Sequence, residues 1–80
     1  MMTFEHCTLE WYWAPAAWQN AQEFQPSFVI FYPNGKEERR PGYSAEVTIA
    51  LSQLGQQGWE AVTCVTAANW LLWTLKRRTA

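Results

Sequence analysis

Few side chains in this 80-residue sequence could carry chemistry, and the first candidates are one histidine and two cysteines. His6 and Cys7 are adjacent, and an imidazole base beside a thiol is a known way to make a nucleophile. They lie, however, in a segment that alternates apolar and polar residues, and neighbouring side chains of a strand point to opposite faces. We therefore expect His6 at the surface and Cys7 in the core, and we predict no catalytic residue.

Cys64 is also expected in the core, because it shares the predicted strand face of Val62. A disulfide between Cys7 and Cys64 would require their two strands to be neighbours, and a reducing cytoplasm disfavours it. All seven acidic residues are glutamates. One histidine, two distant cysteines and scattered glutamates have no spacing that gives three or four converging ligands, so we predict no metal and no cofactor.

The charge of the chain gives no reason to expect nucleic acid or membrane as a partner. Its net charge is −1, which provides no general attraction to phosphates or anionic lipids. Aromatic sheets can bind single strands by stacking, but the aromatic residues here alternate with Leu and Val, as core residues do. No run approaches the roughly 18 apolar residues of a membrane span. The start, MMTFEHCTLEW, lacks a signal-peptide pattern, so we expect a cytoplasmic protein.

The elements that position these residues belong to one domain, residues 1–80, because two cores could not be built from so short a chain. Hydrophobic periodicity predicts one helix, with Ser44 as its N-cap, ending near Gly58. Residues 16–25 fit either a short helix or a loop. The predicted strands are 3–13, 27–32, 36–40, 59–66 and 69–78. We predict an α+β fold: an antiparallel sheet of four or five strands with one main helix packed on one face.

The stretch LGQQGWE, from Leu54 to Glu60, predicts how the helix ends. If Gly58 adopts a positive φ, Trp59 contacts Leu54 in a Schellman ending. Gly55, inside the last turn, is then expected at a point where the helix backbone closely approaches the sheet. A phosphate loop is disfavoured, because such loops precede a helix and these glycines follow one.

The last predicted strand, 69–78, is apolar on both faces. Trp70 and Leu72 point one way, and Leu71 and Trp73 point the other. A single helix can cover only one face, so the second face needs other cover. Residues 14–26, which carry Trp18 and Phe24, could provide it, or a second copy of the protein could. We favour the second copy. The predicted interface residues are Trp11, Trp13, Trp70, Leu72 and Trp73.

Two segments, LSQLGQQGWEAVTCV and WLLWTLKRR, resemble a group of small bacterial domains of unknown function, the family numbered 4177. In that family a helix ending in L-G-x-x-G-W-E leads into a hairpin whose last strand finishes with an apolar or aromatic run and then K-R. The likeness covers roughly residues 47–78, and the first strand, TFEHCTLEW, adds to it. Residues 14–42 are an insertion with an extra hairpin. The resemblance implies an antiparallel sheet crossed by one helix, and no established activity.

These observations favour a small non-enzymatic interaction or assembly module that binds itself through an aromatic sheet surface. The sequence leaves another protein open as a further partner. The alternative is a small-molecule-binding or enzymatic domain with a pocket at a subunit interface. That pocket would be lined by Trp11, Tyr12, Trp13 and Trp18. A flat apolar patch would favour the interaction module, and an enclosed cavity with converging polar groups would favour the ligand-binding or enzymatic domain.

Overall fold

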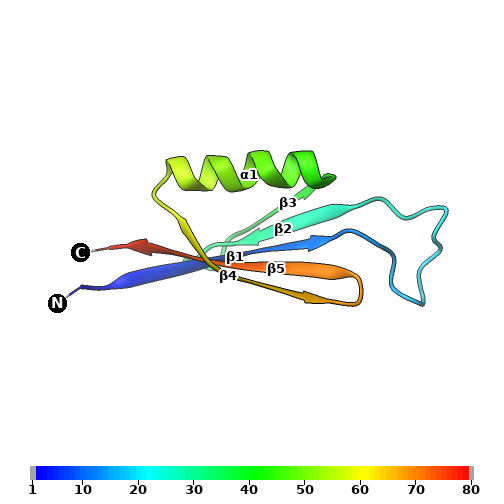
Figure 1. Ribbon diagram of the computed structural model, residues 1–80, viewed down its shortest axis with the longest axis horizontal. Helices are drawn as coiled ribbons and strands as arrows, with labels where there is room; N and C mark the ends of the chain where they lie inside the picture. The colour runs from blue at the N-terminus through cyan, green and yellow to red at the C-terminus, as the bar shows by residue number, and fades with distance from the viewer. Residues whose placement is uncertain (1, 80) are drawn as a thin grey trace.

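The computed structural model describes residues 2–79 and shows a single antiparallel sheet crossed by one helix (Figure 1). The elements are β1 (Phe4–Tyr12), β2 (Ser27–Phe31), β3 (Glu37–Pro41), α1 (Ser44–Gln56), β4 (Glu60–Ala67) and β5 (Trp70–Arg78). The sheet order is β3-β2-β1-β5-β4, and every neighbouring pair is antiparallel. The predicted α+β class, with five strands and one helix on one face, is confirmed.

The sheet is built around β1 and β5, which pair along their whole length from Phe4↔Arg78 to Tyr12↔Trp70. Both chain termini therefore lie at the same end of the sheet (Figure 1). Apolar residues at alternate positions of β1 explain why this segment forms a strand with one buried face: Cys7 is 2% exposed and Leu9 is fully buried.

A tight turn joins β2 to β3, as the sequence Pro33-Asn34-Gly35 predicts. Gly35 has φ +86°, the left-handed conformation that side chains disfavour. Its N–H donates to the Tyr32 carbonyl at 3.0 Å, and the Tyr32 N–H donates to the Lys36 carbonyl at 2.9 Å. These two hydrogen bonds fix the register of the β2–β3 hairpin.

The start of α1 differs from the prediction by one residue. Ser44 is the first helical residue, and the N-cap is Tyr43, whose N–H donates to Glu46 Oε1 at 3.3 Å. The prediction of Ser44 as N-cap was wrong because the Glu46 carboxylate, three residues after the cap, satisfies the backbone in place of a serine hydroxyl.

The end of α1 is a Schellman motif, as the glycine spacing predicts. Gly58 has φ +93°. Its N–H donates to the Gly55 carbonyl, and the Trp59 N–H donates to the Leu54 carbonyl, each at 3.0 Å. This is the hydrogen-bond pair that defines the motif, and Leu54 and Trp59 are both buried in the core.

The close approach of backbone that the sequence assigned to Gly55 occurs instead at Gly42. No atom lies within 4 Å of a Cβ built on Gly55, so that prediction was wrong. A Cβ on Gly42 would lie 2.8 Å from Glu46 Cβ and 2.9 Å from Phe28 Cε1. The Gly42 carbonyl also accepts a hydrogen bond from Trp11 Nε1 at 3.2 Å. Gly42 therefore lets the chain pass from β3 into α1 directly over the core.

The core lies between α1 and the sheet and draws on β1, β2, β5 and the helix. Its buried members are Cys7, Leu9, Phe28, Ile30, Val47, Ala50, Leu54, Trp59 and Leu75. Burying a side chain such as Leu or Phe contributes roughly 1.5–3 kcal/mol, so this cluster is a major source of stabilisation. No residue of β4 belongs to it.

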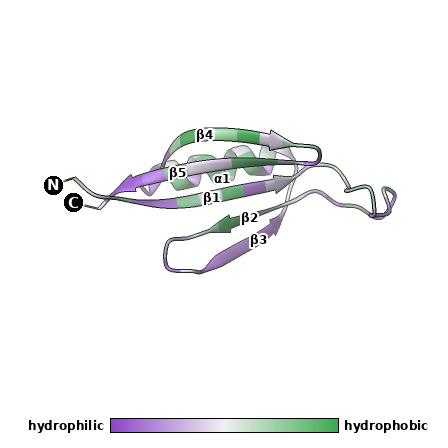
Figure 2. Cartoon of the chain, turned by 90° about the horizontal axis from the view of Figure 1, so that it is seen from below, coloured by the Kyte–Doolittle hydropathy of each residue, from purple (hydrophilic) through white to green (hydrophobic). Residues whose placement is uncertain are grey.

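Residues 13–26 form a loop of turns rather than a helix. The Gln19 N–H donates to the Ala16 carbonyl at 3.0 Å, and the Glu23 N–H donates to the Asn20 carbonyl at 3.1 Å. Of the two alternatives that the sequence left open, the loop is correct. The loop projects beyond the end of the sheet (Figures 1 and 2), and Trp18 within it is 84% exposed. It does not fold back over the sheet face.

Candidate interaction surface

The face of the sheet that lies away from α1, here called the open face, is uncovered by any element of the described chain (Figure 2). Directly paired residues of neighbouring strands point to the same face, so the strand registers define rows across the sheet. One row faces the helix and contains Glu38, Ile30, Leu9, Trp73 and Cys64. The next row faces away from it and contains Arg39, Val29, Glu10, Leu72 and Val65.

Over β4 and β5 the open face carries a group of neighbouring apolar side chains. Val65 pairs with Leu72, and Ala67 pairs with Trp70, so these four side chains form one contiguous group. We call this group the apolar patch. Val65 is 50% exposed, and Leu72 and Trp70 are half-buried. Neither the helix nor the loop covers them.

Toward β2 and β3 the open face is screened by long polar side chains. Val29 lies on this face between Glu10 and Arg39, yet it is only 2% exposed. The Tyr12 hydroxyl donates to Glu10 Oε2 at 2.8 Å, and this hydrogen bond is the main reason that the pKa of Tyr12 is raised. These polar side chains therefore shield Val29, whereas Phe31, on the same face of β2, is 36% exposed. The residues of the apolar patch are all more exposed than Val29.

The five predicted interface residues do not lie on one surface. Trp11 and Trp73 face the helix and pack against the core. Trp70 and Leu72 lie on the open face, and Trp13, just beyond β1, is 44% exposed at the start of the loop. The structure thus brings two of the five together on the open face. Val65 and Ala67 were missed although these two strands were expected to form a hairpin, because the predicted strand ended at residue 66. The observed register, which places Val65 beside Leu72 and Ala67 beside Trp70, depends on where the turn begins.

Every residue of β4 is exposed, including those that face the helix side. A helix about 10 Å wide spans two or three strands spaced about 4.8 Å apart. The strands that share core residues with α1 are β1, β2 and β5. Cys64 is therefore exposed, and the prediction that it lies in the core was wrong. Cys7 is buried, as predicted. Because β5 lies between β1 and β4, the two cysteines are too far apart for a disulfide, and both are free.

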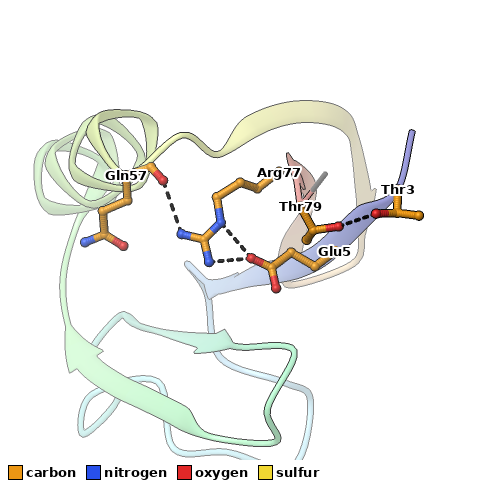
Figure 3. Close-up of polar contacts among 5 residues, drawn as sticks. All are labelled: Thr3, Glu5, Gln57, Arg77 and Thr79. Atoms are coloured by element: carbon orange, nitrogen blue, oxygen red, sulfur yellow. Dashed lines mark hydrogen bonds and ion pairs between the residues drawn. The ribbon is translucent and has the colours of Figure 1, made fainter. Parts of the chain in front are cut away.

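A second polar cluster surrounds Arg77, where the ends of β1, β5 and α1 meet (Figure 3). Arg77 Nε donates to Glu5 Oε1 at 2.7 Å, and Nη1 donates to the Gln57 carbonyl at 3.2 Å. The guanidinium also lies 4.3 Å from the centre of the Trp59 ring. Beside this cluster the Thr3 and Thr79 hydroxyls form a hydrogen bond of 2.6 Å that ties the two terminal segments together.

The Arg77 cluster borders a hollow of about 170 Å³, but its charged groups are already paired with one another. Trp59 Nε1 is the buried side-chain polar atom without a hydrogen-bond partner among residues 2–79, and it is shielded from solvent. The arrangement offers no nucleophile beside a base. It fastens the helix end to the sheet.

The His6–Cys7 pair has no catalytic geometry. His6 is exposed, whereas Cys7 is buried beneath the helix on the opposite face. Burial raises the pKa of the Cys7 thiol to about 11, which keeps it protonated and unreactive at neutral pH. Within residues 2–79, no group of three His, Cys, Asp or Glu side chains could hold a metal ion.

The pocket predicted from Trp11, Tyr12, Trp13 and Trp18 is not formed within one chain. Trp11 and Tyr12 point to opposite faces of β1, and Trp18 lies out on the loop. Among the described residues no helix is both long enough and apolar enough to cross a membrane. No family model, curated protein or solved structure matches this chain, so the resemblance to the family numbered 4177 stays a prediction.

Proposed function

We propose that this protein is a non-enzymatic assembly module that associates with a second copy of itself through the open face of its sheet. The observation that supports this proposal is the apolar patch. Trp70 and Leu72 lie on the second strand from the sheet edge and face away from α1, and the loop that could have covered them projects elsewhere. Burial of such side chains against a partner is favourable by roughly 25 cal/mol per Å² of apolar area removed from water.

A second copy suits this surface for two physical reasons. A domain of 80 residues buries only about 60–65% of its unfolded surface, so packing sheet against sheet enlarges a small core. The net charge of −1 imposes little repulsion between identical chains. The charged side chains on the β3 side of the open face would then form the polar rim that surrounds the apolar centre of an interface.

The second candidate function is a ligand pocket that forms only between subunits, in a small-molecule-binding or enzymatic protein. It is supported by Trp13 and Trp18, which are 44% and 84% exposed at the loop end of the molecule. The Trp13 N–H donates to the Asn69 carbonyl at 3.2 Å, which holds this tryptophan beside the β4–β5 turn and close to the apolar patch. Such a pocket would depend on the same self-association.

Sedimentation velocity over a range of micromolar concentrations tests the proposal. We expect the wild-type chain, of 9.3 kDa, to sediment as an oligomer, and Leu72→Glu to lower its weight-average mass by placing a charge in the apolar patch. The matched control is Ile49→Glu, since Ile49 is 56% exposed on the helix, away from the sheet. This control should leave association unchanged. A wild-type monomer at every concentration, or equal effects of the two variants, would overturn the proposal.

A further inference from the structure

The two edges of the sheet differ in how they are protected against pairing with another strand. β3, at one edge, has the sequence EERRP. Its ion pairs join Arg39 to Glu37 at 3.5 Å and Arg40 to Glu38 at 2.9 Å, and Pro41 lacks an N–H. Charged residues and proline are the usual features that keep an edge strand from recruiting a partner. β3 is therefore a blocked edge.

β4, at the other edge, has no such protection. Residues 61–67, AVTCVTA, contain no charged residue, no proline and no glycine, and four of the seven are the β-branched residues Val and Thr. All of them are exposed, and Val62 and Val65 are about half exposed. The one irregularity is a register shift against β5 at Val62. A long, uncharged, exposed edge of this kind pairs readily with another strand.

The backbone of β4 shows which groups are free to pair. Ala67 and Trp70 are directly paired across the two-residue turn, so they exchange both of their hydrogen bonds. Because hydrogen-bonded and non-hydrogen-bonded pairs alternate along an antiparallel ladder, Val65 also bonds to β5. Cys64 and Thr66 therefore point their N–H and C=O groups to the free edge.

We propose that β4 pairs in antiparallel orientation with β4 of a second copy, about a twofold axis that passes midway between the two Cys64 residues. Cys64 is the midpoint of the uncharged run 61–67, so this register uses the whole run. The antiparallel arrangement also places the two Glu60 carboxylates at opposite ends of the joint, which avoids repulsion between like charges. Directly opposed residues must share a face, and centring the axis between two copies of one residue satisfies this condition.

This pairing makes one sheet that continues across both copies, with both helices on the same side. Cys64 of each copy would form a hydrogen-bonded pair, with a Cα–Cα distance of about 5.5 Å. That distance lies within the range of a disulfide, so the exposed thiol reports the geometry directly. The inference goes beyond the proposed function, because it uses the free edge of β4 and not the open face.

Amide hydrogen exchange measured by NMR tests the edge. In the Leu72→Glu background, where the open face is disabled, we expect the amides of Cys64 and Thr66 to gain protection as the protein concentration rises. If these two amides exchange freely at every concentration, the edge is unpaired and the inference is overturned. The proposed function keeps its own test, because loss of association on Leu72→Glu would still show that the open face is used.

Oxidative crosslinking provides the second measurement. We expect mild oxidation to join two chains through Cys64 at least about tenfold faster than in the double variant Cys64→Ser, Ser52→Cys, because pairing raises the effective concentration of the thiols. Ser52 is exposed on the helix, so this variant carries one accessible thiol at a site outside both proposed surfaces. Equal crosslinking rates for the two proteins would contradict pairing at the edge.

Discussion

The guanidinium of Arg77 lies 4.3 Å from the centre of the Trp59 ring, and the same side chain binds the Glu5 carboxylate and the carbonyl of Gln57. One residue near the end of β5 thus joins the first strand to the C-terminal end of the helix. A cation near the last carbonyls of a helix also interacts favourably with its dipole. The ring of Trp59 is in turn part of the core, so this contact couples the surface cluster to the buried cluster.

We expect Arg77→Ala to lower the free energy of unfolding by about 1–2 kcal/mol, because it removes a cation–π contact and charge-assisted hydrogen bonds. The value is modest because the Arg77 side chain is 37% exposed and solvent screens its charge. Urea denaturation measures the change. The matched control is Arg39→Ala: this side chain is 67% exposed and should contribute no more than about 0.5 kcal/mol. Equal effects of the two substitutions would contradict a role for Arg77 in fastening the helix.

The two glycines of the helix end should respond in opposite directions to alanine. Gly58→Ala forces a Cβ into a residue with φ +93°, with Arg77 Cδ 3.3 Å away, and should cost about 1–2 kcal/mol. Gly55→Ala places a methyl group in open space within α1 and should stabilise the protein by about 0.5–1 kcal/mol. Thermal unfolding of both variants measures the difference. The Schellman geometry would be refuted if both substitutions shifted the melting temperature in the same direction.

The buried thiol of Cys7 should make stability depend on alkaline pH. Burial is the main cause that raises its pKa from 9.0 to about 11. Between these values the folded protein keeps a proton that the unfolded chain has lost, so stability is fully present below pH 9 and falls as pH rises toward 11. The decrease attributable to this group is up to about 2–3 kcal/mol. Cys7→Ala should show a flatter dependence over this range, measured by urea denaturation at each pH. An unchanged slope would mean that Cys7 does not titrate as its burial predicts.

Local patterns predicted the elements well because each depends on residues close in sequence. Alternation in β1, the turn before Gly35 and the ending at Gly58 are short-range features, and the structure has all three. The N-cap was misassigned by one residue because the choice between Tyr43 and Ser44 depends on where the Glu46 side chain points.

Which apolar side chains are exposed was harder to predict, because exposure depends on contacts between segments that are distant in the sequence. Trp11 and Trp70 are both tryptophans on strand faces with apolar neighbours, and only the position of the helix decides that Trp11 is covered and Trp70 is not. In the same way, Cys64 lies on the helix side of β4 but beyond the reach of the helix. The width of one helix against five strands thus determines which residues remain available for contact.

The charges and the proline of β3 have a consequence for the size of any assembly built by strand pairing. Growth of a fibre by strand pairing requires every added molecule to expose a second edge strand that can pair with the next molecule. In this protein the edge opposite β4 is β3, which disfavours pairing. Each chain can therefore pair once, through β4, and the resulting pair has no second β4 edge left to extend. Edge pairing would therefore give a finite pair and no open-ended polymer.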